Sequence, residues 1–364
     1  MSTVHVIAMD THSQTTDICV KTRANGPGRW YHVKTTIPEI AAVIAQVRGP
    51  KELVFEEGPL AGWLLRNLRR HVDKAQVCDP RRNALIAKDG DKDDPIDAGK
   101  LADLRLGGFT RAVHHPESLE RVVLKQTVGL YHERVDHRVA QANKVMGLLK
   151  QWGIMAKEKD FQAAADRERL LAELVASLGA AEGAAGKAVA AHVSLLWRSY
   201  DEALRQEAAL AREMERLAKQ QEVVVRWEQI PGIGWIRGLT LLAYLDTPWR
   251  FKSKRQLWKY MGIGLVREHS GNGHTWVHVD NSGNRALKDA VVGAAETVIM
   301  RKSGELYRRY EWWCKQGQSY KNARRNVARD IAAACWAMWK TGAAFDERLL
   351  GGPRVSDVTE GGGL

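Results

Sequence analysis

Short apolar runs alternate with amphipathic stretches over the first hundred residues. Continuous or alternating apolar patterns predict five strands, at 4–10, 17–23, 28–36, 52–57 and 74–80. Apolar positions at helical spacing predict three helices, at 37–48, at 58–71 and from Pro95 onward. Three strands followed by helix, strand, helix and strand indicate an α/β layer built on a mixed sheet.

The next stretch, residues 116–225, carries almost no strand pattern. Apolar residues recur at helical spacing through many turns of "LLWRSYDEALRQEAALAREMERLAKQQEVVVRW". Long periodic helices with balanced charge indicate an antiparallel helical arm or coiled coil, with an ordinary helical bundle as the alternative. We expect the chain to turn back at the glycine-rich residues 179–187.

From Ile230 the pattern changes again. "IPGIG" is a Pro-Gly-x-Gly turn opening an apolar helix, as in helix–hairpin–helix modules that present backbone amides to phosphate. "GNGHTWVHVDNSGN" predicts a small hairpin with Asn-Gly and Ser-Gly turns, followed by a long helix. Residues 323–340 predict a closing helix with Trp336 and Trp339 on its apolar side. A mostly α-helical domain is therefore expected here.

These patterns divide the chain into four parts. We predict an α/β domain, a helical arm, a mostly helical domain and a flexible glycine-rich tail, at 1–115, 116–225, 226–345 and 346–364. No apolar run is long enough to span a membrane, and the first ten residues lack the pattern of a signal peptide. The four cysteines are far apart and show no zinc-ligand spacing, which favours a reduced, cytoplasmic protein.

Positive charge is concentrated in one region. The chain carries a net charge of +12, and residues 226–340 hold 20 Lys and Arg against 9 Asp and Glu. Residues 116–225 hold 16 of each and are neutral. A localised basic region favours a polyanionic partner, and nucleic acid is the one we expect. The glycines and cations expected to contact it are Gly232, Gly234, Arg250, Lys252, Lys254, Arg255, Arg267 and Arg285.

Three groups of acidic residues stand out in the α/β domain. Asp10 ends the first strand, Glu56 and Glu57 end the strand "ELVFEE", and Asp94 and Asp97 open a helix within "DKDDPIDAGKLA". Acids at strand ends, faced by a helix with two acids on one face, could form an oxygen cage for two Mg²⁺ ions that drives attack on a phosphodiester. Alternatively, Asp94 before Pro95 is an ordinary helix N-cap.

A nucleophile is the second candidate. Ser270 in "REHSGNGHT" lies beside two glycines and within the basic region, so its hydroxyl could attack phosphorus directly. Ser282 in "DNSGN" is a similar candidate, although a serine beside glycine is also an ordinary turn residue.

Taken together, these segments resemble the insertion-sequence-110 family of transposases, the bridge-RNA-guided recombinases, over nearly the whole chain. The resemblance rests on "IAMDTH", "FEEGPLAGWL", "KDDPIDAGKLA", "IPGIG", "RFKSKRQLWKYMGIGLV" and "NSGNRALKDAVVGAA", in this order. It implies a RuvC-like (RNase H-like) domain whose DEDD tetrad falls on Asp10, Glu56, Asp94 and Asp97, and a nucleophilic serine at Ser270. "FEEG" leaves the choice of Glu56 over Glu57 open, and "GLVREHSG" lacks the proline often found before the serine.

The resemblance also implies an activity. The family excises a mobile element and inserts it at DNA sites chosen by a structured non-coding guide RNA. The expected cofactor is Mg²⁺, as two ions, with Mn²⁺ as an alternative. The expected partners are donor and target DNA, the guide RNA and further copies of this chain, forming a dimer or tetramer with composite active sites in a prokaryotic cytoplasm or nucleoid.

Two other functions remain open. A junction resolvase would need only the carboxylates and would release hydrolysed ends through a metal-activated water. A nucleic-acid-binding scaffold with a degenerate nuclease fold would bind tightly in a salt-sensitive manner without turnover.

Overall fold

The computed structural model describes residues 3–83, 94–177, 184–269, 275–279 and 282–350. Within these ranges the side chains at 82–83, 94–96, 184–185, 267–269, 275–277 and 349 are not described. The chain forms two compact units, Met1–Ser118 and Leu119–Leu364. The glycine-rich residues 351–364, expected to form a flexible tail, lie outside the described residues.

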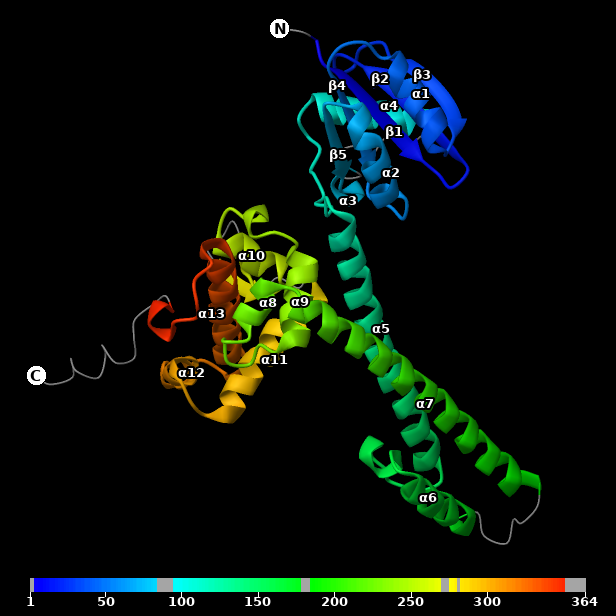
Figure 1. The fold of residues 1–364 in the computed structure, drawn as a ribbon, viewed down its shortest axis with the longest axis vertical. Coiled ribbons are helices and arrows are strands. Elements are labelled where there is room, and N and C mark those ends of the chain that lie inside the picture. The colour runs from blue at the N-terminus through cyan, green and yellow to red at the C-terminus, as the bar shows by residue number, and fades with distance from the viewer. Residues whose placement is uncertain (1–2, 84–93, 178–183, 270–274, 280–281, 351–364) are drawn as a thin grey trace, which may run out of the picture. The chain divides into compact units, whose positions relative to one another are not determined.

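The first unit is built on a mixed five-stranded sheet with the order β3-β2-β1-β4-β5 (Figure 1). Its strands are β1 (His5–Thr11), β2 (Thr15–Lys21), β3 (Arg29–Lys34), β4 (Lys51–Glu56) and β5 (Lys74–Cys78). β1, β4 and β5 run parallel, and β2 and β3 are antiparallel to their neighbours. The predicted mixed α/β sheet is thus confirmed.

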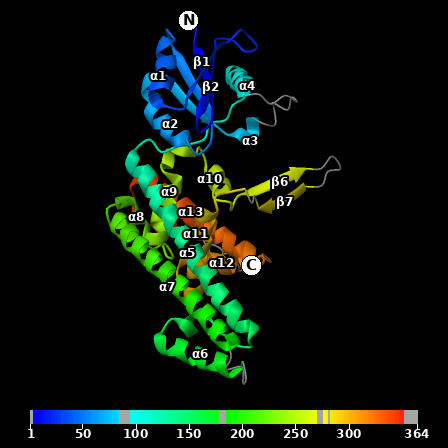
Figure 2. The same ribbon diagram turned by 90° about the vertical axis from the view of Figure 1, so that its right-hand side faces the viewer.

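Helices cover both faces of this sheet (Figure 2). They are α1 (Ile37–Gln46), α2 (Ala61–Leu68), the short α3 (Pro80–Asn83) and α4 (Asp94–Leu106). Ile7, Met9 and Phe55 bury the face beneath α1 and α2. Val6 and Ala8 lie on the opposite face with Ala98 and Ala102 of α4. Because strand side chains alternate between faces, each strand contributes to both cores.

Two long antiparallel helices begin the second unit, α5 (Leu119–Gln151) and α7 (Ala184–Lys219) (Figure 1). Val145 of α5 packs with Val193 near the start of α7, whereas Leu124 shares a core with Met214 near its end. The predicted antiparallel helical pair is therefore present. A helix that the sequence analysis did not separate, α6 (Ala164–Ser177), packs at the far end of the pair.

The helical body follows the arm. It contains α8 (Glu222–Trp227), α9 (Trp235–Leu245), α10 (Lys254–Tyr260), β6 (Leu265–His269), β7 (Thr275–Val279), α11 (Arg285–Arg301), α12 (Glu305–Lys315) and α13 (Tyr320–Thr341). Short 3-10 turns occur at Arg69–His71, Glu158–Phe161, Pro248–Arg250 and Glu347–Leu349. A hairpin is present as β6–β7, which projects from the body in Figure 2, but its first strand lies before the stretch 271–284 that was predicted to form it. Among the described residues, no helix is both long and apolar enough to cross a membrane.

Candidate functional site

Asp10 and Glu56 lie at the ends of two adjacent parallel strands. Met9 of β1 pairs with Phe55 of the parallel strand β4. The next residues, Asp10 and Glu56, therefore lie side by side at the same end of the two strands. Val6 and Ala8 face α4, and Val54 does so on β4. Since alternate residues of a strand share a face, Asp10 and Glu56 continue the two rows that α4 covers.

Glu57 has different surroundings. Its amide donates a hydrogen bond to the Cys78 carbonyl at 2.9 Å. Its Oε2 lies 2.6 Å from His115 Nε2, and this side chain belongs to the segment that leads out of the unit. Glu57 therefore follows the strand end and is held by His115, whereas Glu56 is the last residue of the strand on the α4 face.

The direction of α4 brings its first turn toward these strand ends. Near the far end of the helix, Asp103 accepts a hydrogen bond from Lys21 Nζ at 2.7 Å. Lys21 pairs with Val6 near the start of β1, so α4 runs opposite to β1. Four residues of strand from Val6 to Asp10 cover about 13 Å, and six residues of helix from Asp103 to Asp97 cover about 9 Å.

Asp97 lies in the first turn of α4, is exposed and precedes the buried Leu101 by one turn. Asp94 begins the helix one turn before the buried Ala98, and its side chain is not among those described. The two positions thus continue the row of the helix that packs on the sheet. Asp91 and Asp93 lie outside the described residues.

A close approach fixes α4 on the sheet. A Cβ at Gly99 would lie 2.4 Å from Cη2 of Trp30 on β3, so a larger residue there would require the exposed Trp30 ring to move. Beneath the helix, burial raises the pKa of the Cys19 thiol to about 11 and also raises that of Cys78. These thiols stay protonated near neutral pH and are therefore poor metal ligands and nucleophiles. The carboxylates are the candidate functional groups on this face of the sheet.

A further carboxylate, not among the predicted site residues, lies beside Asp10. Asp17 of β2 is directly opposite Asp10 in the antiparallel pair and is 5% exposed. Its Oδ1 lies 2.9 Å from Nδ1 of His32 on β3. Like charges directly across a strand pair repel, so a cation beside this pair would be stabilising. The alternation of "TTDICV" was the signal that Asp17 faces inward.

The described side chains are not gathered into a metal site. Among them, no three His, Cys, Asp or Glu side chains lie close enough together to hold a metal ion, and Asp94 is outside that set. Asp10, Glu56 and Asp97 nevertheless offer oxygen donors at one edge of one sheet face, and such donors suit Mg²⁺. These residues suit Mg²⁺ because they are carboxylates and because they lie on the same face of the sheet.

In the second unit, a backbone contact holds the β6–β7 hairpin at its base. A Cβ at Gly283 would lie 2.1 Å from the Gly262 amide nitrogen. The Asn284 amide donates to the Tyr260 carbonyl at 2.8 Å, and the Asn284 side chain caps α11. The segments before β6 and after β7 therefore contact each other directly. Ser270 follows the last residue of β6 and lies outside the described residues, whereas Ser282 is described and exposed.

Both glycines of "IPGIG" lie in the turn before α9. Gly232 has a φ of +87° and approaches α11 so closely that a Cβ would lie 2.4 Å from the Ala294 carbonyl oxygen. Arg237 Nη1 donates to the Gly232 carbonyl at 2.6 Å, and burial lowers the pKa of Arg237. Gly234 precedes α9 and has open space around its Cβ position. The turn is thus packed on one side and open on the other.

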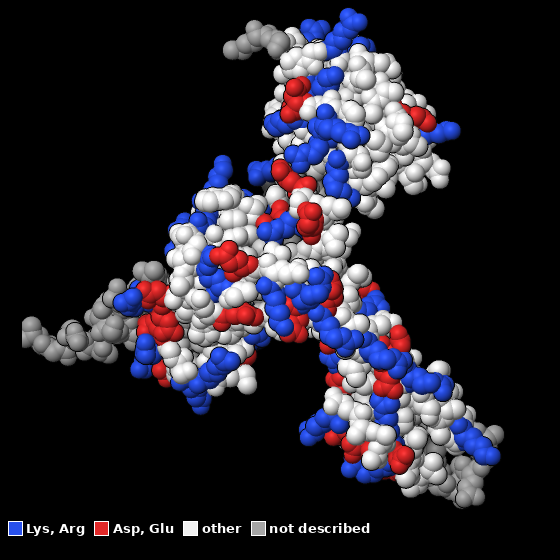
Figure 3. Space-filling model, in the orientation of Figure 1, with Lys and Arg blue, Asp and Glu red and all other residues white. Residues whose placement is uncertain are grey.

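The predicted nucleic-acid cations divide into two groups. Lys252, Lys254, Arg255 and Arg285 are exposed, and the Arg267 side chain is not among those described. Arg250 instead turns inward: its Nη1 donates to the Tyr244 carbonyl at 3.2 Å, and its guanidinium lies 4.1 Å from the Tyr260 ring centroid. Its contacts in this structure are those of a packing residue. On the face in Figure 3, both signs of charge intersperse along the α5–α7 arm.

A cluster that the sequence analysis did not identify lies near these cations. Trp249 is 72% exposed, and Lys340 Nζ lies 5.2 Å from its ring centroid and 3.7 Å from that of Trp336. The segment "TPWRFKSKRQLWKY" interleaves aromatic and basic residues, and this was the available signal.

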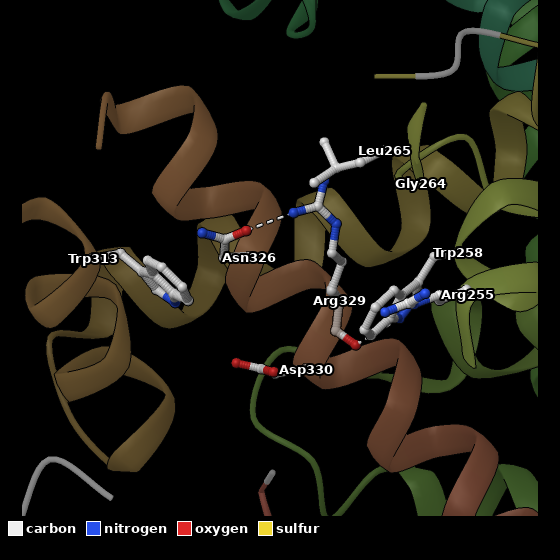
Figure 4. A pocket seen from close by; sticks show the side chains of 8 residues that line it. All are labelled: Arg255, Trp258, Gly264, Leu265, Trp313, Asn326, Arg329 and Asp330. Carbon is white, nitrogen blue, oxygen red and sulfur yellow. Dashed lines mark hydrogen bonds between the residues drawn. The ribbon is translucent and has the colours of Figure 1, made fainter. Parts of the chain in front are cut away.

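A pocket of about 580 Å³ opens at the root of β6 (Figure 4). The residues that line it come from α10, the start of β6, α12 and α13, and are Arg255, Trp258, Gly264, Leu265, Trp313, Asn326, Arg329 and Asp330. Indole rings, cations, an amide and a carboxylate thus surround one cavity.

Comparison with known proteins finds similarity to transposases. Over 224 residues it is 22% identical to the transposase for insertion sequence element IS1111A of Coxiella burnetii, covering 61% of this chain and 58% of that protein. Over 263 residues it is 24% identical to "Putative transposase y4pF/y4sB" of Sinorhizobium fredii, covering 70% and 64%. The chain thus spans less than two thirds of the length of either relative. Residues 226–311, which include the hairpin and the "IPGIG" turn, match the model of the transposase IS116/IS110/IS902 family.

Proposed function

We propose that this protein is an RNA-guided DNA transposase that cleaves and rejoins strands to excise and insert a mobile element. The observation that carries the proposal is the placement of Asp10 and Glu56 at adjacent strand ends, on the face covered by α4, in a chain with the transposase-family segment. Acids at the strand ends of an α/β unit support a RuvC-like assignment for residues 1–118.

The four carboxylates of the proposed tetrad would act as metal ligands. Asp10, Glu56, Asp94 and Asp97 would hold Mg²⁺, as two ions, with Mn²⁺ as an alternative. When bound, the metal neutralises the scissile phosphate and orients it for in-line displacement. Asp17 and His32 sit beside Asp10 and set the charge of its surroundings.

Ser270 is the proposed nucleophile. The Ser270 hydroxyl loses its proton as Oγ forms a bond to phosphorus, the bond from phosphorus to the leaving nucleotide oxygen breaks, and that oxygen takes up a proton, so the step is balanced. The covalent phosphoserine keeps the energy of the broken bond for rejoining. The backbone contact between Gly283 and Gly262 holds the base of the hairpin on which this serine lies in the chain.

Two variants and one matched control test this chemistry. Ser270→Ala should abolish covalent protein–DNA adducts, whereas Ser282→Ala, the matched control in the neighbouring turn, should retain them. Asp97→Ala should remove magnesium-dependent cleavage. Adducts that persist in Ser270→Ala would refute the serine assignment. Hydrolysed ends without adducts in the wild type would establish the resolvase alternative, and binding without cleavage would establish the scaffold.

We also propose composite active sites, in which Ser270 of one copy acts with the carboxylates of another. The helical arm supports this because it exposes large apolar side chains, with Leu130 at 50%, Leu195 at 54% and Leu204 at 42%. Mixing Ser270→Ala with Asp97→Ala protein should restore part of the cleavage activity that each variant lacks alone. No recovery from the mixture would exclude sites shared between copies.

Guide RNA is the remaining part of the proposal. If base pairing to RNA reads the target, the protein needs backbone contacts to nucleic acid, and a diffuse basic region suits that need. Sequencing the RNA that co-purifies with the full chain tests this. A single structured RNA encoded beside the gene is the expected result, and random cellular RNA would contradict it.

A further inference from the structure

The pocket at the root of β6 has two aromatic walls that are held in place. Trp258 Nε1 donates to the Arg329 carbonyl at 3.1 Å. Trp313 is braced edge-to-face by Trp312, with ring centroids 4.6 Å apart and an angle of 73° between the planes. Indoles fixed in this way can stack on a planar ligand without losing further side-chain entropy.

The polar groups of the pocket are also oriented. Arg329 Nε donates to the Ile263 carbonyl at 2.7 Å, and its Nη1 donates to Asn326 Oδ1 at 2.5 Å (Figure 4). Because Asn326 uses its oxygen for Arg329, its amide nitrogen remains as the donor for a ligand. Asp330 accepts from Arg309 Nε at 2.8 Å and supplies a carboxylate to the same cavity.

A cation completes the set. Arg255 lines the pocket from α10 and is exposed, so it can meet a ligand phosphate at the entrance. A stacking surface, a donor and an acceptor for a base edge, and a cation for phosphate together match one ligand class, a nucleotide. The volume of about 580 Å³ is that of a small-molecule site.

We propose that this pocket captures an unpaired nucleotide of the DNA strand being cut, with its base against Trp313 and its phosphate at Arg255. The pocket could also bind a free mononucleotide, and the assignment of a nucleotide within a DNA strand as its ligand rests on the proposed function. Leu265 lines the pocket and lies five residues before Ser270, which is roughly 17 Å of extended strand. A captured nucleotide would therefore lie a few positions from the attacked phosphate and would hold that strand unstacked.

The test compares two duplexes that both contain one 2-aminopurine and differ only in whether a base stands opposite it. In one duplex the 2-aminopurine is paired, and in the other it is an unpaired bulge. The full-length wild type should bind the bulged duplex about tenfold more tightly, with a change in 2-aminopurine fluorescence on binding. Trp313→Leu should remove this preference, and Trp152→Leu, which changes a tryptophan at the end of the arm, should keep it.

A second variant covers the case in which Trp313→Leu fails to fold. Asn326→Ala removes the base-edge donor without touching either indole, and it should lower the preference at least about threefold. A wild type without the preference, or a folded Trp313→Leu and an Asn326→Ala that both retain it, would overturn the proposal. Displacement of the bulged duplex by deoxyadenosine monophosphate at equal concentration would assign the pocket to a free nucleotide instead.

The failure of this inference can be told apart from failure of the proposed function. Ser270→Ala should lose adducts yet keep the preference for the bulged duplex. Adducts in Ser270→Ala would refute the recombination chemistry alone. An unchanged preference in the pocket variants, together with normal serine-dependent adducts, would refute the pocket alone.

Discussion

Glu56 and Glu57 are neighbours in the sequence, but their side chains have different surroundings. Glu56 follows Glu52 and Val54 on the face that α4 covers, and Glu52 on that face contacts Arg105 of α4 at 2.5 Å. Glu57 contacts His115 instead. The alternation of side chains along a strand, and not the type of residue, favours Glu56 as the metal ligand.

Glu56→Gln should reduce magnesium-dependent DNA cleavage at least about 100-fold, because an amide is a weaker and neutral ligand in a site that must balance metal charge. Glu57→Gln, the matched control, should change the rate by no more than about fivefold, since it alters only the contact of Glu57 with His115. Cleavage rates in excess Mg²⁺ measure both. The reverse ranking of the two variants would assign Glu57 to the metal.

The buried side chain of His132 makes the stability of the folded protein depend on pH. The Thr240 hydroxyl donates a hydrogen bond to the Ile236 carbonyl, so its oxygen accepts one from the His132 Nε2–H at 3.0 Å. Burial lowers the pKa of His132 below 6.5, although the carboxylates of Asp136 and Asp289 partly oppose this. A histidine held neutral must be protonated at a cost, and this cost disfavours the folded state in acid.

The unfolded chain therefore binds this proton at a higher pH than the folded one. Stability due to His132 is complete above pH 6.5 and is lost as pH falls from 6.5 through the folded pKa. The urea concentration at the unfolding midpoint of the wild type should decrease when the pH is lowered from about 7.5 to about 5.5. The same change of pH should decrease the midpoint of His132→Gln by less. Equal falls in the two proteins would contradict this account.

Among the elements, the hairpin depends on a backbone contact that a side chain would destroy. Gly283→Ala places a carbon 2.1 Å from the Gly262 nitrogen, and the two loops must separate. The cost should be about 1–3 kcal/mol of stability, with a loss of adduct formation as the hairpin base shifts. Urea unfolding and the adduct assay measure the two effects.

Gly147→Ala is the matched control within the second unit. Gly147 is exposed in α5, and no atom lies within 4 Å of its Cβ position. Alanine should raise stability by about 0.5–1 kcal/mol there through its greater helix propensity. A Gly283→Ala protein as stable as this control would show that the loops separate without cost.

The arm is held by pairs of charges as well as by its core. Arg138 Nε contacts Glu207 at 2.5 Å across α5 and α7, and Arg167 makes a two-bonded contact with Asp201 at 2.8 and 2.6 Å. The hydrogen bonds from Arg167 lower the pKa of Asp201. These pairs use charges within the arm itself, which agrees with its net neutrality and leaves the basic excess to the body.

For the whole molecule, the uneven charge predicts a steep salt dependence. Residues 226–340 carry a net charge of +11, so nucleic-acid binding should release many counterions. Affinity for nonspecific duplex DNA should fall at least about 100-fold between 50 and 200 mM NaCl. Fluorescence anisotropy across a salt series measures the slope.

Two double variants locate the effect. Lys252→Gln with Arg255→Gln should make the log–log slope shallower by up to about two, one for each phosphate contact. Arg169→Gln with Lys219→Gln removes two exposed charges from the arm and should leave the slope unchanged. An equal effect of both pairs would mean that the arm contacts nucleic acid as much as the body.

Local pattern determined much of this protein. Apolar alternation and helical spacing were sufficient to predict the five strands and three of the four described α-helices of the first unit, the long helices of the arm, the second strand of the hairpin and the closing helix of the body. These features depend on residues within one or two turns of each other, and the sequence displays that spacing directly. The acids at strand ends followed from the same patterns.

Tertiary structure decided what depends on residues far apart in the chain. The pairing of β1 with β2 placed Asp17 opposite Asp10, and the packing of α4 decided which face of β4, and so which of Glu56 and Glu57, shares the surroundings of Asp10. The inward turn of Arg250, the contact of Gly283 with Gly262 and the pocket beside Trp313 each join distant segments. Periodicity shows which face of an element is apolar, but only packing determines which other element covers that face.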